Sequence, residues 1–138
     1  MSDNNRRSVF CIDMILNHLN LTVADLPMVK DKLTTYFDFE AMDPKPNDTL
    51  SILKSKDDFT LVLMSNRMNK NGQHAYPDAF HFGFFVQSVQ EVMDKYEQLK
   101  SGNIKLDQEP QFMRKSFGFY FHLDSLMIEI AAQDVQEP

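Results

Sequence analysis

Two histidines and one glutamate stand out among the residues whose side chains could do chemistry. His18 and His81 lie 63 positions apart, and Glu129 follows near the end of the 138-residue chain. Imidazole and carboxylate groups bind divalent metal ions and transfer protons, and Tyr120 and His122 add a phenol and a third imidazole. What these groups can do together depends on the elements that position them.

Both histidines open the same local pattern. The segments HLNLTVADL from His18 and HFGFFVQSV from His81 each have His, four mixed residues, Val, any residue, a helix-capping residue and an apolar residue. In each copy a strand-like run, 15–23 or 80–86, leads into the cap and then into a helical pattern. The chain is therefore expected to contain two copies of one structural unit.

Each copy continues into a helix with a single apolar stripe. Asp25 is expected to cap the first helix, and Ser88 with Glu91 forms a capping box that starts the second near Val89. Gly102 is expected to end the second helix. The stripe residues recur at spacings of three and four: Leu26, Val29, Leu33 and Phe37, then Val89, Val92, Met93, Tyr96 and Leu99.

Three extended segments are expected after each helix. They are 39–43, 49–54 and 59–64 in the first copy, and 104–112, 117–123 and 126–132 in the second. The polar stretch 66–78, which includes His74, links the copies. The sequence thus predicts one α+β domain over residues 1–138, with two β-α-β-β-β modules at about 14–65 and 79–133 that form an open, cleft-forming mixed β-sheet with the helices on the outside.

Strand alternation places the chemically active side chains on one face of the sheet. In the first strand Leu19, Leu21 and Val23 are suited to covering by the helix, which leaves His18 and Asn20 on the other face. The same parity turns these residues away from the helices: Thr22, His81, Phe85, Tyr120, His122, Met127 and Glu129.

This face has two interpretations. Antiparallel sheets often have one polar side in water, which would make it an ordinary exposed surface. Val62, Met64, Phe85 and Met127 lie on the same face, however, and favour a concave, partly apolar cleft. A cleft of that kind is the usual form of a small-molecule site.

Composition and charge narrow the class of protein. The net charge of −6 opposes the phosphate contacts on which nucleic-acid binding depends. The single Cys11 excludes an internal disulfide framework and fits a cytoplasmic location, and no segment has the run of apolar residues that a membrane helix needs. The apolar stretch 9–16 is interrupted by Asp13 and is expected to be a short arm before the first strand, not a signal peptide.

Several stretches resemble one superfamily. The segment from Leu16 to Pro27 is similar to the first strand and helix entry of fosfomycin-resistance thiol transferases, and 81–86, 118–121 and 128–130 are similar to later family strands. The chain thus resembles the vicinal oxygen chelate superfamily, which includes glyoxalases, bleomycin-resistance proteins and extradiol dioxygenases, over nearly its whole length.

The resemblance implies a metal centre. In that family each half supplies a first-strand and a last-strand position, which here are His18, Val62, His81 and Glu129. Three of the four can bind metal, and two imidazoles with one carboxylate suit Fe(II) or Mn(II), with Zn(II) or Ni(II) as alternatives. Val62 stands where glyoxalase I has a further carboxylate ligand, which argues against that activity.

The resemblance also implies roles around the metal. Tyr120 is placed to hydrogen-bond a metal-bound oxyanion, or is simply exposed at the sheet surface, and His122 is a candidate acid or base that may instead face solvent near the turn. Asn20, Thr22, Val62 and Phe85 are the candidate substrate contacts. The thiol transferases' cationic residue after the last strand is missing, which argues against phosphonate binding, although Arg114 and Lys115 could partly compensate.

Three function hypotheses follow. The leading one is a metal-dependent enzyme, dioxygenase-, lyase- or thiol-transferase-like, acting on a small oxygen-chelating substrate and forming the homodimer that the resemblance implies. The second is a metal-free protein that sequesters a drug or aromatic ligand on surfaces such as Phe85 and Tyr120. The third is a partner-binding module without a small-molecule site. The sequence names no substrate.

Overall fold

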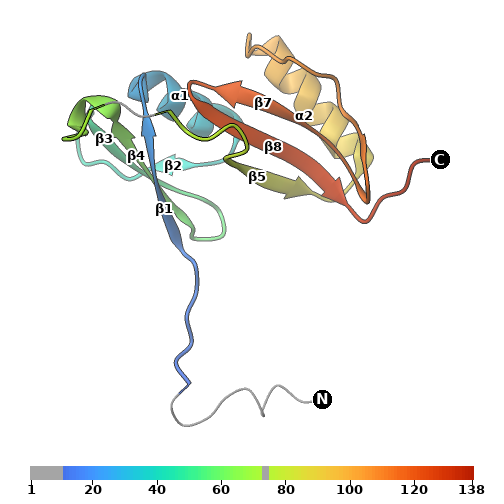
Figure 1. Ribbon diagram of the computed structural model, residues 1–138, viewed down its shortest axis with the longest axis horizontal. Coiled ribbons are helices and arrows are strands. Elements are labelled where there is room, and N and C mark those ends of the chain that lie inside the picture. The colour runs from blue at the N-terminus through green and yellow to red at the C-terminus, as the bar shows by residue number, and fades with distance from the viewer. Residues whose placement is uncertain (1–10, 73–74) are drawn as a thin grey trace.

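The computed structural model describes residues 11–72 and 75–138 (Figure 1). His74 lies outside the described residues. The first module consists of β1 (His18–Val23), α1 (Leu26–Tyr36), β2 (Glu40–Ala41), β3 (Leu50–Lys54) and β4 (Thr60–Ser65), followed by the 3-10 helix η2 (Asn66–Met68). The second consists of β5 (His81–Val86), α2 (Val89–Ser101), β6 (Gln111–Met113), β7 (Ser116–Leu123) and β8 (Leu126–Gln133).

The two modules have the same strand topology. The first forms a sheet in the order β1-β4-β3-β2 and the second a sheet in the order β5-β8-β7-β6. In each, the first strand is parallel to the last, and the other pairs are antiparallel. The predicted α+β class with two β-α-β-β-β modules is confirmed, and the strands form two open four-stranded sheets in which β1 and β5 are edge strands.

The helices begin and end where the capping residues indicated. The carboxylate of Asp25 accepts a hydrogen bond from the backbone N–H of Met28 at 3.2 Å, and Ser88 Oγ accepts from the N–H of Glu91 at 3.1 Å. Gly102 caps the end of α2. Leu26, Val29 and Leu33 of α1 are buried, as are the α2 residues Val92, Tyr96 and Leu99, so each helix packs its stripe against the sheet of its own module.

One hydrophobic core runs through both modules. The ring of Phe37, just after α1, stacks on Phe84 of β5 with centroids 4.9 Å apart and on Phe121 of β7 at 6.0 Å. Lys95 of α2 donates a hydrogen bond to the carbonyl of Tyr36 at 2.6 Å. The end of α1 therefore docks the first module onto the second, with α1 and α2 on the same side of the molecule (Figure 1).

Asp124, in the turn between β7 and β8, joins the modules a second time. Its carboxylate accepts hydrogen bonds from the backbone N–H groups of Ala24 at 3.0 Å and Asp25 at 2.9 Å, at the junction of β1 and α1. It also accepts from the N–H of Ser125 at 2.8 Å. Burial acts to raise the pKa of Asp124, but these hydrogen bonds outweigh it and hold the pKa below its usual value.

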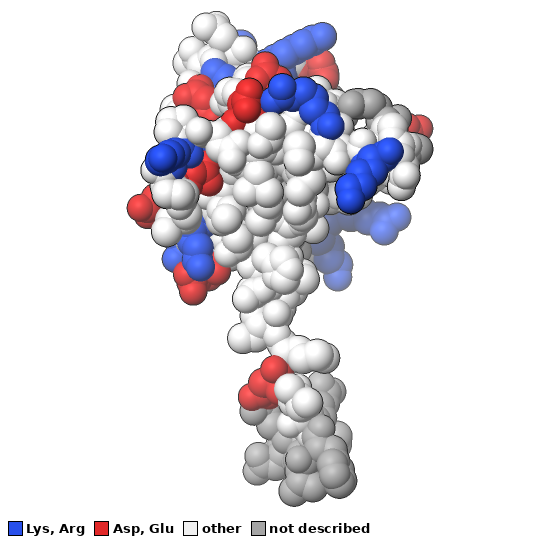
Figure 2. Space-filling model, turned by 90° about the vertical axis from the view of Figure 1, so that its left-hand side faces the viewer, with Lys and Arg blue, Asp and Glu red and all other residues white. Residues whose placement is uncertain are grey.

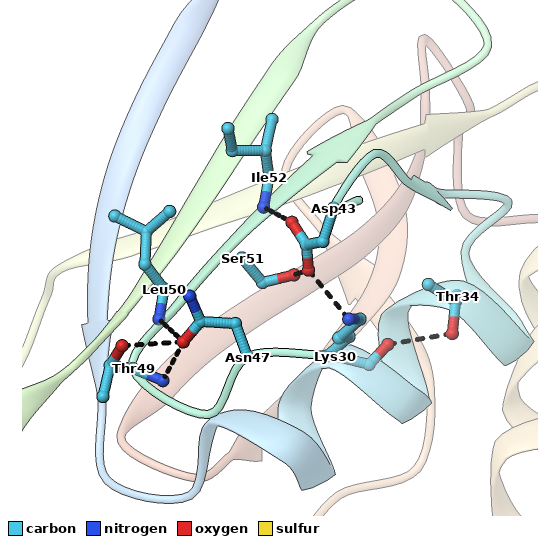
Figure 3. A network of polar contacts seen from close by, with 8 residues as sticks. All are labelled: Lys30, Thr34, Asp43, Asn47, Thr49, Leu50, Ser51 and Ile52. Atoms are coloured by element: carbon cyan, nitrogen blue, oxygen red, sulfur yellow. Dashed lines mark hydrogen bonds and ion pairs between the residues drawn. The ribbon is translucent and has the colours of Figure 1, made fainter. Parts of the chain in front are cut away.

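A second carboxylate fixes the connection between β2 and β3. Asp43 accepts hydrogen bonds from Lys30 Nζ at 2.8 Å, Ser51 Oγ at 2.6 Å and the N–H of Ile52 at 2.8 Å (Figure 3). Asn47 Oδ1 accepts from the N–H of Thr49 at 2.9 Å in the same connection. These bonds tie the β2–β3 connection to α1, so that sheet and helix of the first module form one body.

Two predicted segments differ from the structure. The first strand begins at His18 and not at residue 15, because its partner β4 begins at Thr60 and only Asn17 O extends the pairing. The predicted segment 104–112 is a strand only from residue 111, where β6 begins, since the polar run 107–109 and Pro110 precede it and buried Ile104 anchors an irregular connection.

Residues 11–17 form an arm that leads away from the body of the protein (Figure 1). The side chains of Ile12, Met14, Ile15 and Leu16 are 79% to 89% exposed, so no part of residues 11–72 and 75–138 covers this apolar segment. Within residues 11–72 and 75–138, no helix has the length and apolar character to cross a bilayer.

Candidate functional site

The chemically active residues lie on the sheet faces that the helices do not cover. Register places His81, Met127 and His122 in one row across β5, β8 and β7, and Gly83, Glu129 and Tyr120 in the next. Phe119, Phe121, Ile128 and Ile130 alternate with them and are buried. The alternation predicted from the sequence is therefore present in the second module.

His81 and Glu129 form the centre of this face. His81 Nε2 lies 3.4 Å from Glu129 Oε1, and His81 Nδ1 lies 2.9 Å from the carbonyl oxygen of Ala79. A carbonyl oxygen only accepts hydrogen bonds, so Nδ1 carries the proton of the neutral imidazole and the lone pair is on Nε2. A nitrogen lone pair then faces a carboxylate oxygen, which is a donor set for a cation.

Tyr120 completes the cluster. Its ring contacts that of His81 edge to face, with centroids 5.3 Å apart, and its hydroxyl donates a hydrogen bond to the carboxylate of Glu129. Partial burial raises the pKa of Tyr120, and the negative charge of Glu129 and this hydrogen bond raise it further. The phenol of Tyr120 is therefore protonated at neutral pH and remains a hydrogen-bond donor to Glu129.

Two hollows flank the cluster. One, of about 380 Å³, is lined by His81, Tyr120 and His122 together with Asp107, Gln108 and Met127. The other, of about 540 Å³, is lined by Tyr120 and Glu129 together with residues of the β6–β7 hairpin. The cluster thus lies where a small molecule in either hollow would reach it. Asp107 and Gln108 belong to the irregular segment before β6, and no local sequence pattern indicated that this segment borders the site.

His18 is placed apart from this cluster. It is exposed at the first position of β1, and its Nδ1 lies 2.8 Å from Asn17 Oδ1, so that Nε2 is the ring nitrogen turned away from this contact. Within the described part of the chain, no three His, Cys, Asp or Glu side chains lie close enough together to hold one metal ion. A single chain therefore brings together His81, Tyr120 and Glu129, but not His18.

The remaining candidate residues divide between the two sheets. Asn20 of β1 is exposed and lies opposite half-buried Val62 of β4, the same register that Gly83 and Glu129 have in the second module. Thr22 is half-buried, and its backbone N–H and carbonyl bind the hydroxyl of Tyr76 at 2.7 and 2.8 Å. Phe85 of β5 is 67% exposed. Val62 is therefore the structural counterpart of Glu129.

The fold thus consists of paired β-α-β-β-β modules, with a His–Glu pair on the uncovered sheet face of the second. The sequence matches the family model of the Glyoxalase/Bleomycin resistance protein/Dioxygenase superfamily over residues 15–134. The chain belongs to this superfamily.

Solved structures share the fold of this chain. A protein from Bacillus cereus described as a possible glyoxalase has 28% sequence identity and a TM-score of 0.71, with 86% of this chain and 98% of that chain covered. The fosfomycin resistance protein FosX from Listeria monocytogenes has 20% identity and a TM-score of 0.68, covering 88% and 94%. Lactoylglutathione lyase from Agrobacterium tumefaciens has 16% identity and a TM-score of 0.67, covering 87% and 94%. No curated protein matches the sequence.

Proposed function

We propose that the protein is a divalent-metal-dependent enzyme whose centre combines His81 and Glu129 of one copy with His18 of a second. The observation that carries this proposal is that His81 Nε2 faces Glu129 Oε1 at 3.4 Å, while His81 Nδ1 lies 2.9 Å from the carbonyl oxygen of Ala79. Two such lone-pair donors attract a cation, and one more imidazole makes the two-His, one-carboxylate set that suits Fe(II) or Mn(II).

A second copy is the source of His18 that the topology favours. His18 and His81 are the first residues of the equivalent edge strands β1 and β5, and each of these strands has one unpaired edge. A two-fold arrangement that sets β1 of one copy beside β5 of the other brings the two histidines to one place, and does so twice per dimer.

Uncovered apolar surface on the first module also supports a dimer. Ile12 and Leu16 in the arm, and Met42 and Ile52 on the sheet, are exposed. Figure 2 views this side of the molecule and shows an area free of charged residues, with Lys, Arg, Asp and Glu around its edge. Apolar surface surrounded by charged residues is typical of protein–protein contacts.

The bound ion would supply Lewis-acid chemistry to a substrate that chelates it through neighbouring oxygen atoms. Around that place, the hydroxyl of Tyr120 holds a proton and donates it in a hydrogen bond, since its pKa is raised. His122 lines the hollow next to His81 and is the candidate acid or base. Exposed Phe85 offers a ring for stacking, and Asn20, Thr22 and Val62 would come from the partner copy with His18.

The type of reaction follows from the ligand count. Val62 occupies the position equivalent to Glu129 and has no donor atom, so the centre has three protein ligands at most. This favours dioxygenase-, lyase- or thiol-transferase-like chemistry over that of glyoxalase I. A cytoplasmic location, inferred from the single Cys11, fits a reduced metal such as Fe(II).

Complementation between two variants tests the shared centre. His18→Ala and His81→Ala should each form dimers without bound metal. A heterodimer of the two, purified through different affinity tags, should hold about one Mn(II) ion, against about two for the wild-type dimer, because one of its two sites has both histidines. Elemental analysis and sedimentation measure metal content and assembly.

Three results would contradict parts of the proposal. A heterodimer without metal would show that His18 and His81 do not share a site between copies. A wild-type protein that takes up none of Fe(II), Mn(II), Zn(II) or Ni(II) would exclude the metal centre. Equal binding of an aromatic ligand with and without chelator would then favour the metal-free sequestration protein.

A further inference from the structure

The hollow beside Tyr120 and Glu129 has a feature that the metal centre does not use. Its outer wall is the β6–β7 hairpin with Arg114 and Lys115 at its tip, and its volume is about 540 Å³. Two cationic side chains therefore line the same space as the phenol and carboxylate of the cluster. A molecule that reaches Glu129 from this side passes the hairpin.

The backbone of Arg114 is in an unusual conformation for its residue type. Met113 and Ser116 pair across the hairpin and leave Arg114 and Lys115 as the two-residue turn, in which Arg114 has φ of 53°. Six described residues other than Gly have positive φ, and the other five are Asp or Asn: Asp38, Asp58, Asn103, Asp124 and Asp134. Asp and Asn adopt this conformation more readily than Arg does, so the turn holds a guanidinium at a cost to stability.

Neither cation is neutralised by the described part of the chain. Lys30, Lys54 and Arg67 make ion pairs with aspartates at 2.8, 3.3 and 3.1 Å, whereas Arg114 and Lys115 make no ion pair with a described residue. The hairpin itself is anchored, because Ser116 Oγ donates to the carbonyl of Met113 at 3.0 Å and the N–H of Val135 donates to the carbonyl of Lys115 at 3.2 Å.

The other charged groups around the hollow set a condition for anion binding. The carboxylates of Glu129 and Asp134 also line it and repel an anion. A divalent ion on Glu129 would remove much of that repulsion. Binding of an anion at the hairpin and binding of metal at Glu129 should therefore strengthen each other.

We propose that Arg114 and Lys115 bind an oxyanion group of the substrate, a carboxylate or a phosphoryl group, in the hollow beside Tyr120 and Glu129. The inference rests on the proposed function, because the metal centre proposed above would bind the other end of the same substrate. The planar guanidinium of Arg114 suits two oxygens of one group, and Lys115 adds a point charge. The substrate would then be a small anion that chelates metal at one end and meets the hairpin at the other.

Calorimetric titration with methylphosphonate and with acetate tests this, each in chelated protein and in protein loaded with Mn(II). Wild-type protein should bind one of the two probes, and more tightly when loaded. Arg114→Gly should bind it at least about tenfold more weakly, whereas Arg67→Gln, which removes an exposed cation elsewhere, should bind it as the wild type does.

Thermal stability separates a binding role from a structural one. Glycine adopts positive φ without strain, so Arg114→Gly should melt at the same temperature as the wild type or higher while it loses the probe. A lower melting temperature with unchanged probe binding, no binding of either probe by wild type, or equal loss in Arg67→Gln would overturn the inference. If the protein binds no metal but still binds the probe through Arg114 in the presence of chelator, the proposed metal centre is contradicted and the oxyanion site is not.

Discussion

The two modules share one scaffold but differ in what they carry on it. Asn20 lies opposite Val62 in the first module in the register that Gly83 and Glu129 have in the second. The second module therefore pairs its histidine with a carboxylate, while the first has a histidine beside an apolar side chain. The comparison teaches that two modules with the same strand register can carry side chains of different chemistry at equivalent positions.

The same difference explains why neither module alone has all three side chains of the proposed metal centre. His81, Glu129 and Tyr120 lie together within the second module, whereas Asn17 is the one side-chain partner of His18 among the described residues. In the proposed centre, the first module would contribute His18 and apolar surface. A complete centre would need both kinds of module, and the free edges of β1 and β5 are where they could meet.

Glu129→Val should have the largest effect, because it gives the second module the same residue that the first module has at the equivalent position, Val62. Affinity for Mn(II), measured by titration, should fall more than about 100-fold, since loss of even an outer-shell partner costs about 10–100-fold. Glu109→Val removes an equal charge from an exposed loop and should bind Mn(II) as before. Unchanged affinity in Glu129→Val would show that this carboxylate is not a ligand.

Asp124→Asn tests how far the modules depend on each other. Asparagine tolerates the φ of 57° but lacks the charge that accepts three backbone N–H groups, so the free energy of unfolding should fall by about 2 kcal/mol at neutral pH. Asp58→Asn is the matched control, because Asp58 also has positive φ and makes only an exposed ion pair with Lys54.

The same variant should change the response to acid. The pKa of Asp124 is lowered in the folded protein, so its contribution is complete above the ordinary aspartate value of 3.8 and is lost as pH falls through the lower folded-state pKa. Urea unfolding between neutral pH and pH 3 should therefore show the two proteins converging in stability at the acid end. A constant gap across that range would mean that the charge of Asp124 contributes nothing.

Gly83→Ala should have the smallest effect. It adds one carbon atom beside Glu129 and so tests how accurately that residue must be positioned. A Cβ at this position would lie 2.9 Å from the carbonyl oxygen of Glu129 and 3.0 Å from its Cβ, so β5 and β8 must separate slightly. We expect a stability loss of about 1 kcal/mol and a several-fold weaker affinity for Mn(II). Lower stability with unchanged affinity for Mn(II) would show that metal binding does not depend on so small a shift of Glu129.

Local patterns in the sequence predicted the faces of the strands well. Alternation correctly turned Phe119 and Phe121 inward and Tyr120 outward, and the caps Asp25 and Ser88 marked both helix starts. These features depend on neighbours in the chain, so the sequence contains them directly.

Contacts between segments far apart in the chain could not be predicted from the sequence. Parity shows which face His18 occupies, but not how the two sheets are arranged, and the separation of His18 from His81 depends on that arrangement. The docking of Phe37 on Phe84 and the bonds of Asp124 to Ala24 join residues far apart in the chain and have no local pattern. The positive φ of Arg114 likewise becomes evident only when the backbone angles of the turn are known.

The position of Asp124 has a consequence for how the protein is made. The N–H groups of Ala24 and Asp25 lie 100 and 99 positions before the residue whose carboxylate accepts their hydrogen bonds. The entry to α1 therefore stays incomplete until the turn between β7 and β8 has been synthesised, and the first module gains these hydrogen bonds only once most of the second module has been made.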